Sequence, residues 1–297
     1  MRIIRKTNLD FLGKKYIGLI LSITFISCGL VSLVLNSGLK LSIDFTGGTV
    51  VQVLFKETPD ISTIRLNLDE NGFENAEVIE FGSPNELLIK TNLIENTDEA
   101  NKKLSAIFSD LEYEIRRIEM VGPKIGNELK KDAIYAISFA LIGILIYVWF
   151  RFDKYYAAGS VIALIHDVFI TLGLFSILNK EIDLSIIAAI LTIVGYSLND
   201  TIVVFDRIRE NIHKNTKEKL EYVVNISLNE TLARTLITSI TTLVVVVILL
   251  FLGGEVINNF AFALTLGVLI GTYSSLFVAS PVMVYLENRR SEKIVIE

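Results

Sequence analysis

Six long apolar runs constrain the fold of this chain more than any other feature of its sequence. A membrane-spanning helix needs about 20 consecutive apolar residues. The 297 residues are 52% hydrophobic, with a mean hydropathy of +0.54, which is more apolar than an ordinary soluble domain. We therefore expect a polytopic α-helical membrane protein. Transmembrane helices are predicted at residues 16–35, 132–150, 155–178, 184–205, 232–252 and 260–286. The first run is longer than the apolar core of a cleaved signal peptide, so we expect it to be retained.

Basic residues predict how these helices are oriented. Lys and Arg gather in the tail 1–15, after the second and fourth runs, and in the tail 287–297. The loops at 179–181 and 253–255 are poor in positive charge. The positive-inside rule then places both termini in the cytoplasm and residues 36–131 on the opposite side of the membrane. The net charge of -5 gives no reason to expect a nucleic-acid partner.

Residues 36–131 return to a soluble composition and predict a small domain. Strands are expected at 50–55, 77–81, 87–91 and 113–121, with helices at 60–71 and 97–110 and a turn at 82–85. The apolar residues of the first helix are Ile61, Ile64, Leu66 and Leu68. The order β-α-β-β-α-β predicts a ferredoxin-like α+β domain. It holds no nucleophile paired with a base and no Gly-rich phosphate loop. We expect a binding or moving module and no enzyme activity.

Metal and disulfide chemistry find little support in the composition. The single cysteine, Cys28, lies in an apolar run and excludes an internal disulfide. Two histidines and one cysteine cannot build an ordinary structural zinc site. We expect no metal and no cofactor.

The fourth predicted span carries an aspartate, Asp200, in a segment that should lie within the membrane. Asp200 lies about two turns before Arg207 and therefore within the membrane. An ionisable side chain there is costly, and it is a functional hypothesis by default. One helical face carries Thr192, Tyr196, Asn199, Asp200 and Val203, with Thr201 beside it. We do not expect that face to contact lipid.

The fifth and third spans carry further polar groups. Arg234 stands at the start of a stripe that could reach a carboxylate on a neighbouring helix, or it could extend to the membrane surface. The stripe is Thr231, Arg234, Thr235, Thr238, Thr241 and Thr242. In the third span, His166 and Asp167 could pair with polar groups inside a bundle, and functional and structural roles are equally open for them.

These groups suit a proton path. An aspartate that alternates between an apolar site and the vicinity of an arginine takes up and releases a proton, which couples protonation to conformation. The membrane potential supplies about 2.3 kcal/mol per charge per 100 mV. The alternative is a static buried ion pair between helices. The residues do not distinguish H⁺ from Na⁺.

Several stretches together resemble the SecF family of the Sec translocase. They are residues 43–49, 121–129, 151–152, 164–168, 195–211, 231–235 and 271–275, of which Gly195 to Asn211 is the most specific. Residues 56–115 carry no matching motif. The resemblance implies a six-span half of the RND superfamily with an inserted external domain. It implies SecD, the SecYEG channel, the ATPase SecA, the translocating polypeptide and membrane lipid as partners. It also implies that the proton-motive force drives late translocation, with the family's membrane aspartate at Asp200 and its arginine at Arg234.

Glycine-containing motifs flank the external domain. Asp44, Gly47 and Gly48 follow the first span, and Gly122, Pro123 and Gly126 precede the second. The Gly-Gly pair offers backbone freedom, as a hinge or as an ordinary tight turn. In the sixth span, the spacing of Gly267 and Gly271 predicts close helix packing.

Three other functions stay open at this point. An RND-type exporter of small molecules or lipids would use the same carboxylate, but larger external modules are usual there. An intramembrane aspartyl protease could use Asp167 and Asp200, but the customary Gly-x-Gly-Asp context is missing. A scaffold that only stabilises its partners would carry no proton.

Overall fold

The computed structural model describes residues 7–73, 76–91, 102, 104–108 and 111–296. The chain divides into two compact units. The helical unit consists of Met1–Lys40, Ala136–Lys180 and Ser185–Glu297, and the α+β unit consists of Leu41–Tyr135 and Glu181–Leu184. Each unit is described by itself.

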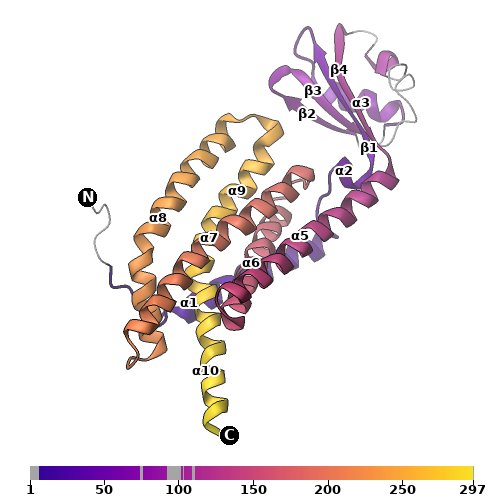
Figure 1. Ribbon diagram of the computed structural model, residues 1–297. Coiled ribbons are helices and arrows are strands. Elements are labelled where there is room, and N and C mark those ends of the chain that lie inside the picture. Colours follow the sequence, from indigo (N-terminus) through magenta and orange to yellow (C-terminus); the bar gives the residue numbers. More distant parts are fainter. Residues whose placement is uncertain (1–6, 74–75, 92–101, 103, 109–110, 297) are drawn as a thin grey trace. The chain divides into compact units, whose positions relative to one another are not determined.

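Long helices make up the helical unit (Figure 1). They are α1 (Lys15–Leu35), α5 (Pro123–Arg151), α6 (Lys154–Ile177), α7 (Leu184–Lys214), α8 (Leu220–Leu252), α9 (Glu255–Ser274) and α10 (Ser280–Ile296). The start of α5, up to Tyr135, and the first residue of α7 belong to the α+β unit. A π-helical turn, η1 (Ser275–Ala279), joins α9 to α10. Within the described residues, 6 stretches are long and apolar enough to cross a membrane, with α9 to α10 counted as one. This result confirms the predicted number of spans.

The helix ends differ from those expected. α5 begins at Pro123, α7 runs on to Lys214, and α8 begins at Leu220. The apolar runs mark only the part of each helix that avoids water. Backbone hydrogen bonds continue along the helix into polar sequence, so hydropathy alone placed these ends too close to the apolar core.

Small residues bring the spanning helices together. A Cβ on Gly29 of α1 would lie 2.8 Å from the Cα of Gly173 on α6. A Cβ on Gly271 of α9 would lie 2.9 Å from the Cβ of Ser197 on α7, and one on Gly267 would overlap Ile193. The predicted close packing at Gly267 and Gly271 is confirmed, because no larger residue fits against α7 there.

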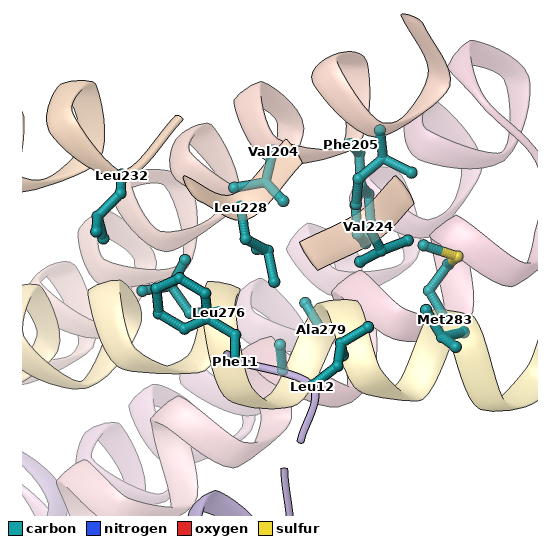
Figure 2. Close-up of a cluster of buried hydrophobic side chains, with 13 residues drawn as sticks. Phe11, Leu12, Val204, Phe205, Val224, Leu228, Leu232, Leu276, Ala279 and Met283 are labelled. Carbon is teal, nitrogen blue, oxygen red and sulfur yellow. The ribbon is translucent and has the colours of Figure 1, made fainter. Parts of the chain in front are cut away.

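The segment before α1 packs into a buried apolar cluster (Figure 2). The backbone N–H of Phe11 donates to Asn225 of α8 at 2.8 Å, and that of Leu9 donates to Asn229 at 2.7 Å. The cluster includes Phe11, Leu12, Val204, Phe205, Val224, Leu228, Leu276 and Met283. The N-terminal segment is thus held against α7, α8 and α10 by burial of its apolar side chains and by hydrogen bonds to the side-chain amides of α8.

The α+β unit contains one four-stranded sheet in the order β2-β3-β1-β4, with every neighbouring pair antiparallel. Its elements are α2 (Ile43–Thr46), β1 (Gly48–Phe55), α3 (Ile61–Glu70), β2 (Glu77–Phe81), β3 (Ser83–Thr91) and β4 (Tyr113–Val121). This is the strand order of a ferredoxin-like fold, as predicted from the β-α-β-β-α-β pattern. Figure 1 shows α3 against the sheet.

One face of the sheet forms the core of the α+β unit. Alternate residues of β1 point inward, as a strand requires. The core includes Val51, Val53, Phe55, Ile64, Leu68, Val78, Leu87, Ile89, Leu104, Ile107 and Phe108. Leu66 of α3 is 63% exposed, because it lies off the Ile64 and Leu68 face. One local prediction was wrong. The turn expected at 82–85 shortens to Gly82, which has a φ of 75°, because β3 already begins at Ser83.

The second predicted helix, 97–110, lies partly outside the described residues. Residues 104–107 are helical, and Leu104, Ile107 and Phe108 are buried together.

Candidate functional site

Asp200 lies buried beside a pair of hydroxyl groups from α8 and α9. Its side chain is on α7 and the residue is 3% exposed. The hydroxyl of Ser239 on α8 donates to the Oδ2 of Asp200 over a long 3.5 Å. The same hydroxyl lies 2.6 Å from the Oγ1 of Thr272 on α9. The sequence therefore placed Asp200 correctly as a polar group inside the bundle, held by few and weak contacts.

The π-helical turn η1 contacts α7 at Thr201, the residue that follows Asp200. The hydroxyl of Thr201 lies 3.0 Å from that of Ser275, the first residue of η1. The hydroxyl of Ser280 donates to the Ser275 carbonyl at 3.0 Å. π-helical turns leave α-helical carbonyls without their usual partners and occur often at functional sites. Sequence reasoning missed this feature because the apolar run through 260–286 shows no interruption.

Arg234 does not pair directly with Asp200. Among the described ion pairs within 4.0 Å, none joins the two residues. Arg234 is exposed on α8, while its charge and the Thr238 hydroxyl both act on the Asp200 carboxylate. The buried hydroxyl of Thr235 has no hydrogen-bond partner within the described chain. The predicted stripe is therefore divided between a buried side and an exposed charge.

The polar face of α7 is divided in the same way. Asp200 and Thr201 point into the bundle, whereas Thr192 and Asn199 are exposed. The Tyr196 hydroxyl is buried without a hydrogen-bond partner in the part of the chain that the structure describes. Polar groups at membrane depth must be covered by protein or line an aqueous cavity. The exposed side of this face is thus a surface that the chain leaves uncovered.

His166 and Asp167 meet groups that the sequence did not single out. Asp167 accepts hydrogen bonds from the hydroxyls of Ser197 at 2.6 Å and Ser274 at 2.8 Å. His166 lies 2.9 Å from both the Oδ1 of Asp167 and the hydroxyl of Ser22. The network therefore joins α6 to α1, α7 and α9. Ser197 and Ser274 lie within the family motifs at 195–211 and 271–275, whereas Ser22 lies in an apolar run that gave no signal for its role.

The two glycine motifs come together inside the α+β unit. Asp44 accepts a hydrogen bond at 3.0 Å from the backbone N–H of Leu184. Gly47 has a φ of 79°, and a Cβ there would lie 3.0 Å from Pro123. A Cβ on Gly126 would lie 2.7 Å from the carbonyl of Phe45. These contacts require glycine and form a tight junction. Motion at this junction stays a prediction.

Two other features bear on earlier predictions. Around Gly122, a Cβ would meet nothing within 4 Å, so packing does not explain this glycine. Within the described ranges, no group of three or more His, Cys, Asp or Glu could hold a metal ion.

Comparison with known proteins identifies the family. Residues 100–289 match the model "Protein export membrane protein SecD/SecF, C-terminal", and residues 32–59 match the "SecD/SecF GG Motif". The protein translocase subunit SecF of Desulfurispirillum indicum is 45% identical over 285 residues, covering 92% of this chain and 88% of that protein. SecF of Thermodesulfovibrio yellowstonii is 45% identical over 292 residues, covering 96% and 97%.

A solved structure shows the same fold. The crystal structure of SecDF from Thermus thermophilus matches with a TM-score of 0.85 and 38% identity, over 95% of this chain and 39% of that one. The chain thus spans well under half of SecDF but nearly the full length of the SecF relatives. An RND-type exporter is not favoured by these matches. By its sequence motifs, its fold and these relatives, the chain belongs to the SecF family of protein translocase subunits.

Proposed function

We propose that this chain pairs with SecD in the bacterial inner membrane and uses the proton-motive force to promote late steps of polypeptide translocation. Asp200 is the proton carrier in this proposal. The observation that carries it is a buried carboxylate with one long hydrogen bond, 3.5 Å to Ser239, on a helix whose outer polar side is uncovered. A carboxylate so weakly held can change its protonation state without breaking a complete network.

SecD is the partner that would cover the exposed side of α7. Thr192 and Asn199 are exposed there, and the Tyr196 hydroxyl is unpaired within the described chain. The SecDF structure contains a longer chain, of which this one matches 39%. A second six-span half supplied by SecD would bring new polar groups to this surface and complete the site. SecYEG, SecA and the exported polypeptide are the further partners of the assembled translocase.

In this proposal, the attraction between Arg234 and Asp200 depends on whether Asp200 is protonated. The Arg234 guanidinium acts on Asp200 without a direct ion pair, so a small helix movement changes their interaction strongly. Thr235 and Thr238 line the same helix. Protonation of Asp200 removes this attraction and frees the helices to move. No cofactor and no covalent chemistry on the substrate are part of the proposal.

The α+β unit lies on the outer side of the membrane in this proposal, with both termini in the cytoplasm. The cytoplasmic side carries the basic residues, including Lys14, Lys15 and Arg207. On the outer side, the α+β unit would contact the emerging polypeptide and move with the proton cycle through the Asp44, Gly47 and Gly126 junction.

The test is preprotein export into sealed vesicles that contain the native partners and carry an imposed proton gradient. Asp200→Asn is compared with wild type and with Asp206→Asn, a matched change on the same helix at a residue paired with Arg151 at 3.0 Å. We expect Asp200→Asn to assemble normally and lose the gradient-dependent part of export, while Asp206→Asn retains it. If Asp200→Asn exports like wild type, the carboxylate carries no proton and the chain acts as a scaffold.

A further inference from the structure

A long groove runs along the helical unit between α1, α6, η1 and α10. Its volume is about 1010 Å³, at the upper end of the range of about 300–1,000 Å³ that is typical of ligand pockets. Tyr16 and Leu30 of α1 both line it, and the helix rises about 21 Å between them. One leaflet of the hydrocarbon core is about 15 Å deep. The groove is therefore long enough for an acyl chain in one leaflet.

The wall of the groove is apolar over most of its length. Ile23 lines it from α1, Phe169 from α6 and Phe277 from η1. The polar exceptions in this part are Ser22 and His166, whose polar atoms lie 2.9 Å from each other. An apolar surface at membrane depth is covered by hydrocarbon more favourably than by water. The occupant of this part of the groove is thus a hydrocarbon chain.

Charged side chains gather at one end of the groove. Lys15 begins α1, Glu221 lies in the first turn of α8, and Arg289 lies on α10. All three line the groove. The side-chain amide of Asn288 donates to Glu221 at 2.6 Å, which holds the start of α8 against α10. The apolar groove therefore has a polar mouth with charges of both signs.

The three charges at the mouth have no ionic partner within the described part of the chain. No ion pair within 4.0 Å includes Lys15, Arg289 or Glu221 there. The two cations lie over tyrosine rings instead. Lys15 is 5.5 Å from the ring centroid of Tyr16, and Arg289 is 4.9 Å from that of Tyr285. Both tyrosines line the groove, and tyrosine is typical of the membrane surface. A ligand at the membrane surface can therefore reach both cations and the carboxylate.

A smaller recess adjoins the mouth. Its volume is about 410 Å³, and Lys15 and Glu221 line both the recess and the groove. Asp10 lines the recess, where its carboxylate accepts the backbone N–H of Gly13 at 2.8 Å. The recess thus presents two carboxylates to a cationic group. An anionic group beside Lys15 and Arg289 stays in the mouth of the groove.

We propose that the groove binds one phospholipid whose headgroup ends in a primary ammonium, as phosphoethanolamine does. The phosphodiester pairs with Lys15 and Arg289, because charge-assisted hydrogen bonds to phosphate oxygens are among the strong ones. The ammonium enters the recess and donates to Glu221 and Asp10. One acyl chain lies along the apolar wall. This binding site is additional to the proposed function and does not depend on it.

A lipid bound in this way differs from the lipid that surrounds any spanning helix. Boundary lipid only covers apolar surface and has no reason to prefer one headgroup. The groove instead offers basic groups at its mouth and carboxylates in the adjoining recess. Phosphoethanolamine has the same order, because its phosphate is nearer to the acyl chains than its ammonium is. A headgroup with only negative charge would be repelled by Glu221.

Native mass spectrometry of the purified full chain tests the headgroup. The chain is offered equal amounts of phosphatidylethanolamine, phosphatidylglycerol and phosphatidylcholine with identical acyl chains. We expect it to retain one phosphatidylethanolamine, several-fold more often than either of the others. Phosphatidylcholine should bind more weakly because its quaternary ammonium has no N–H to donate. Equal retention of the three lipids overturns the proposal.

Charge-removing variants locate the headgroup. Lys15→Gln should weaken retention of every phospholipid about tenfold, as loss of one charge-assisted hydrogen bond produces. Lys14→Gln is its control, because Lys14 is exposed and does not line the groove. Glu221→Gln keeps an acceptor for Asn288 but should abolish the preference for phosphatidylethanolamine over phosphatidylglycerol. The exposed Glu218→Gln should leave that preference intact. If neither groove variant changes retention or preference, the mouth binds no headgroup and the proposal is wrong.

Spin-labelled phosphatidylethanolamine in vesicles tests the apolar wall. Wild type should hold one motionally restricted lipid in addition to its boundary lipid. Ile23→Trp should release this lipid, because Ile23 lines the groove and is 54% exposed. Ile20→Trp should retain it, because Ile20 is 65% exposed on the same helix and does not line the groove.

Two outcomes of the vesicle experiment contradict the proposal. One is that Ile23→Trp keeps the restricted lipid. The other is that wild type holds no such lipid while Ile23→Trp lowers co-purification with SecD, which would mean that a partner helix fills the groove. Loss of export in Asp200→Asn bears only on the proposed function, because Asp200 and Ser239 do not line the groove.

Discussion

Asp167 and Asp200 are both buried aspartates in spanning helices, and the chain surrounds them differently. Asp167 accepts two hydroxyls at 2.6 and 2.8 Å and faces a histidine at 2.9 Å. Asp200 accepts one hydrogen bond from the Ser239 hydroxyl at 3.5 Å, and the Thr238 hydroxyl also acts on it. The hydroxyls of Tyr196 and Thr235 on the same two helices have no hydrogen-bond partner among the described residues. Both carboxylate oxygens of Asp167 have close partners within the chain, whereas the helices around Asp200 leave two buried hydroxyls without a partner among the described residues.

This difference indicates a division of labour. A complete polar network fixes one arrangement of helices, because every change leaves a buried group unpaired. An incomplete network leaves buried polar groups unpaired, which costs free energy. A partner or a proton that supplies the missing hydrogen bonds removes this cost. We infer that the Asp167 network holds the helical unit together and that the Asp200 site responds to what binds it.

The largest expected effect is on stability. Asp167→Ala removes the carboxylate that accepts two buried serine hydroxyls and faces His166. Each stranded buried polar group costs about 1–3 kcal/mol, so the free energy of unfolding should fall by several kcal/mol. Asp200→Ala should cost much less, since it strands only Ser239, which keeps Thr272 at 2.6 Å. SDS titration of the purified chain in mixed micelles, followed by circular dichroism, compares the two. Equal losses would erase the distinction between the sites.

A smaller effect should appear in assembly rather than in folding. The double variant Thr192→Leu and Asn199→Leu makes the exposed side of α7 apolar. Surface changes usually alter stability by less than about 0.5 kcal/mol, so the chain alone should unfold as before. Co-purification with SecD should nevertheless drop several-fold, because the partner's polar groups lose their counterparts. Thr24→Leu on exposed α1 is the control. Undiminished co-purification would mean that SecD covers another surface.

The smallest effect lies in the α+β unit, far from either aspartate in the sequence. The Thr63 hydroxyl at 2.6 Å and the backbone N–H of Ser62 at 3.2 Å hold the pKa of Asp60 below its ordinary value of 3.8. Because the folded pKa is the lower one, the cap stabilises α3 above pH 3.8 and this contribution is lost as pH falls through the folded pKa.

Asp60→Ala should therefore lower the hydrogen-exchange protection of α3 slightly at pH 7, and the difference from wild type should shrink in acid. Amides of α1 and α7 should not change. A difference that persists unchanged well below pH 3.8 would show that the cap acts through something other than the charge.

The sequence by itself determined the main outline of this protein. Runs of about 20 apolar residues can only be buried in lipid or in a large core, so the six spans followed directly. Alternating patterns separated by turns gave the strands and their β-α-β-β-α-β order. Motif residues pointed to the family, and the cost of charge in lipid drew attention to Asp200, Arg234, His166 and Asp167.

Only the tertiary structure decided which polar groups meet. Periodicity places Thr192, Asn199 and Asp200 on one broad face of α7, but it does not say which helix packs against that face. It therefore could not show that Asp200 is buried while Thr192 and Asn199 stay exposed. Ser22 and Ser274 are 252 residues apart along the chain and join the same network through His166 and Asp167. A hydroxyl's role depends on what lies opposite it across a helix contact, and that information resides in the packing.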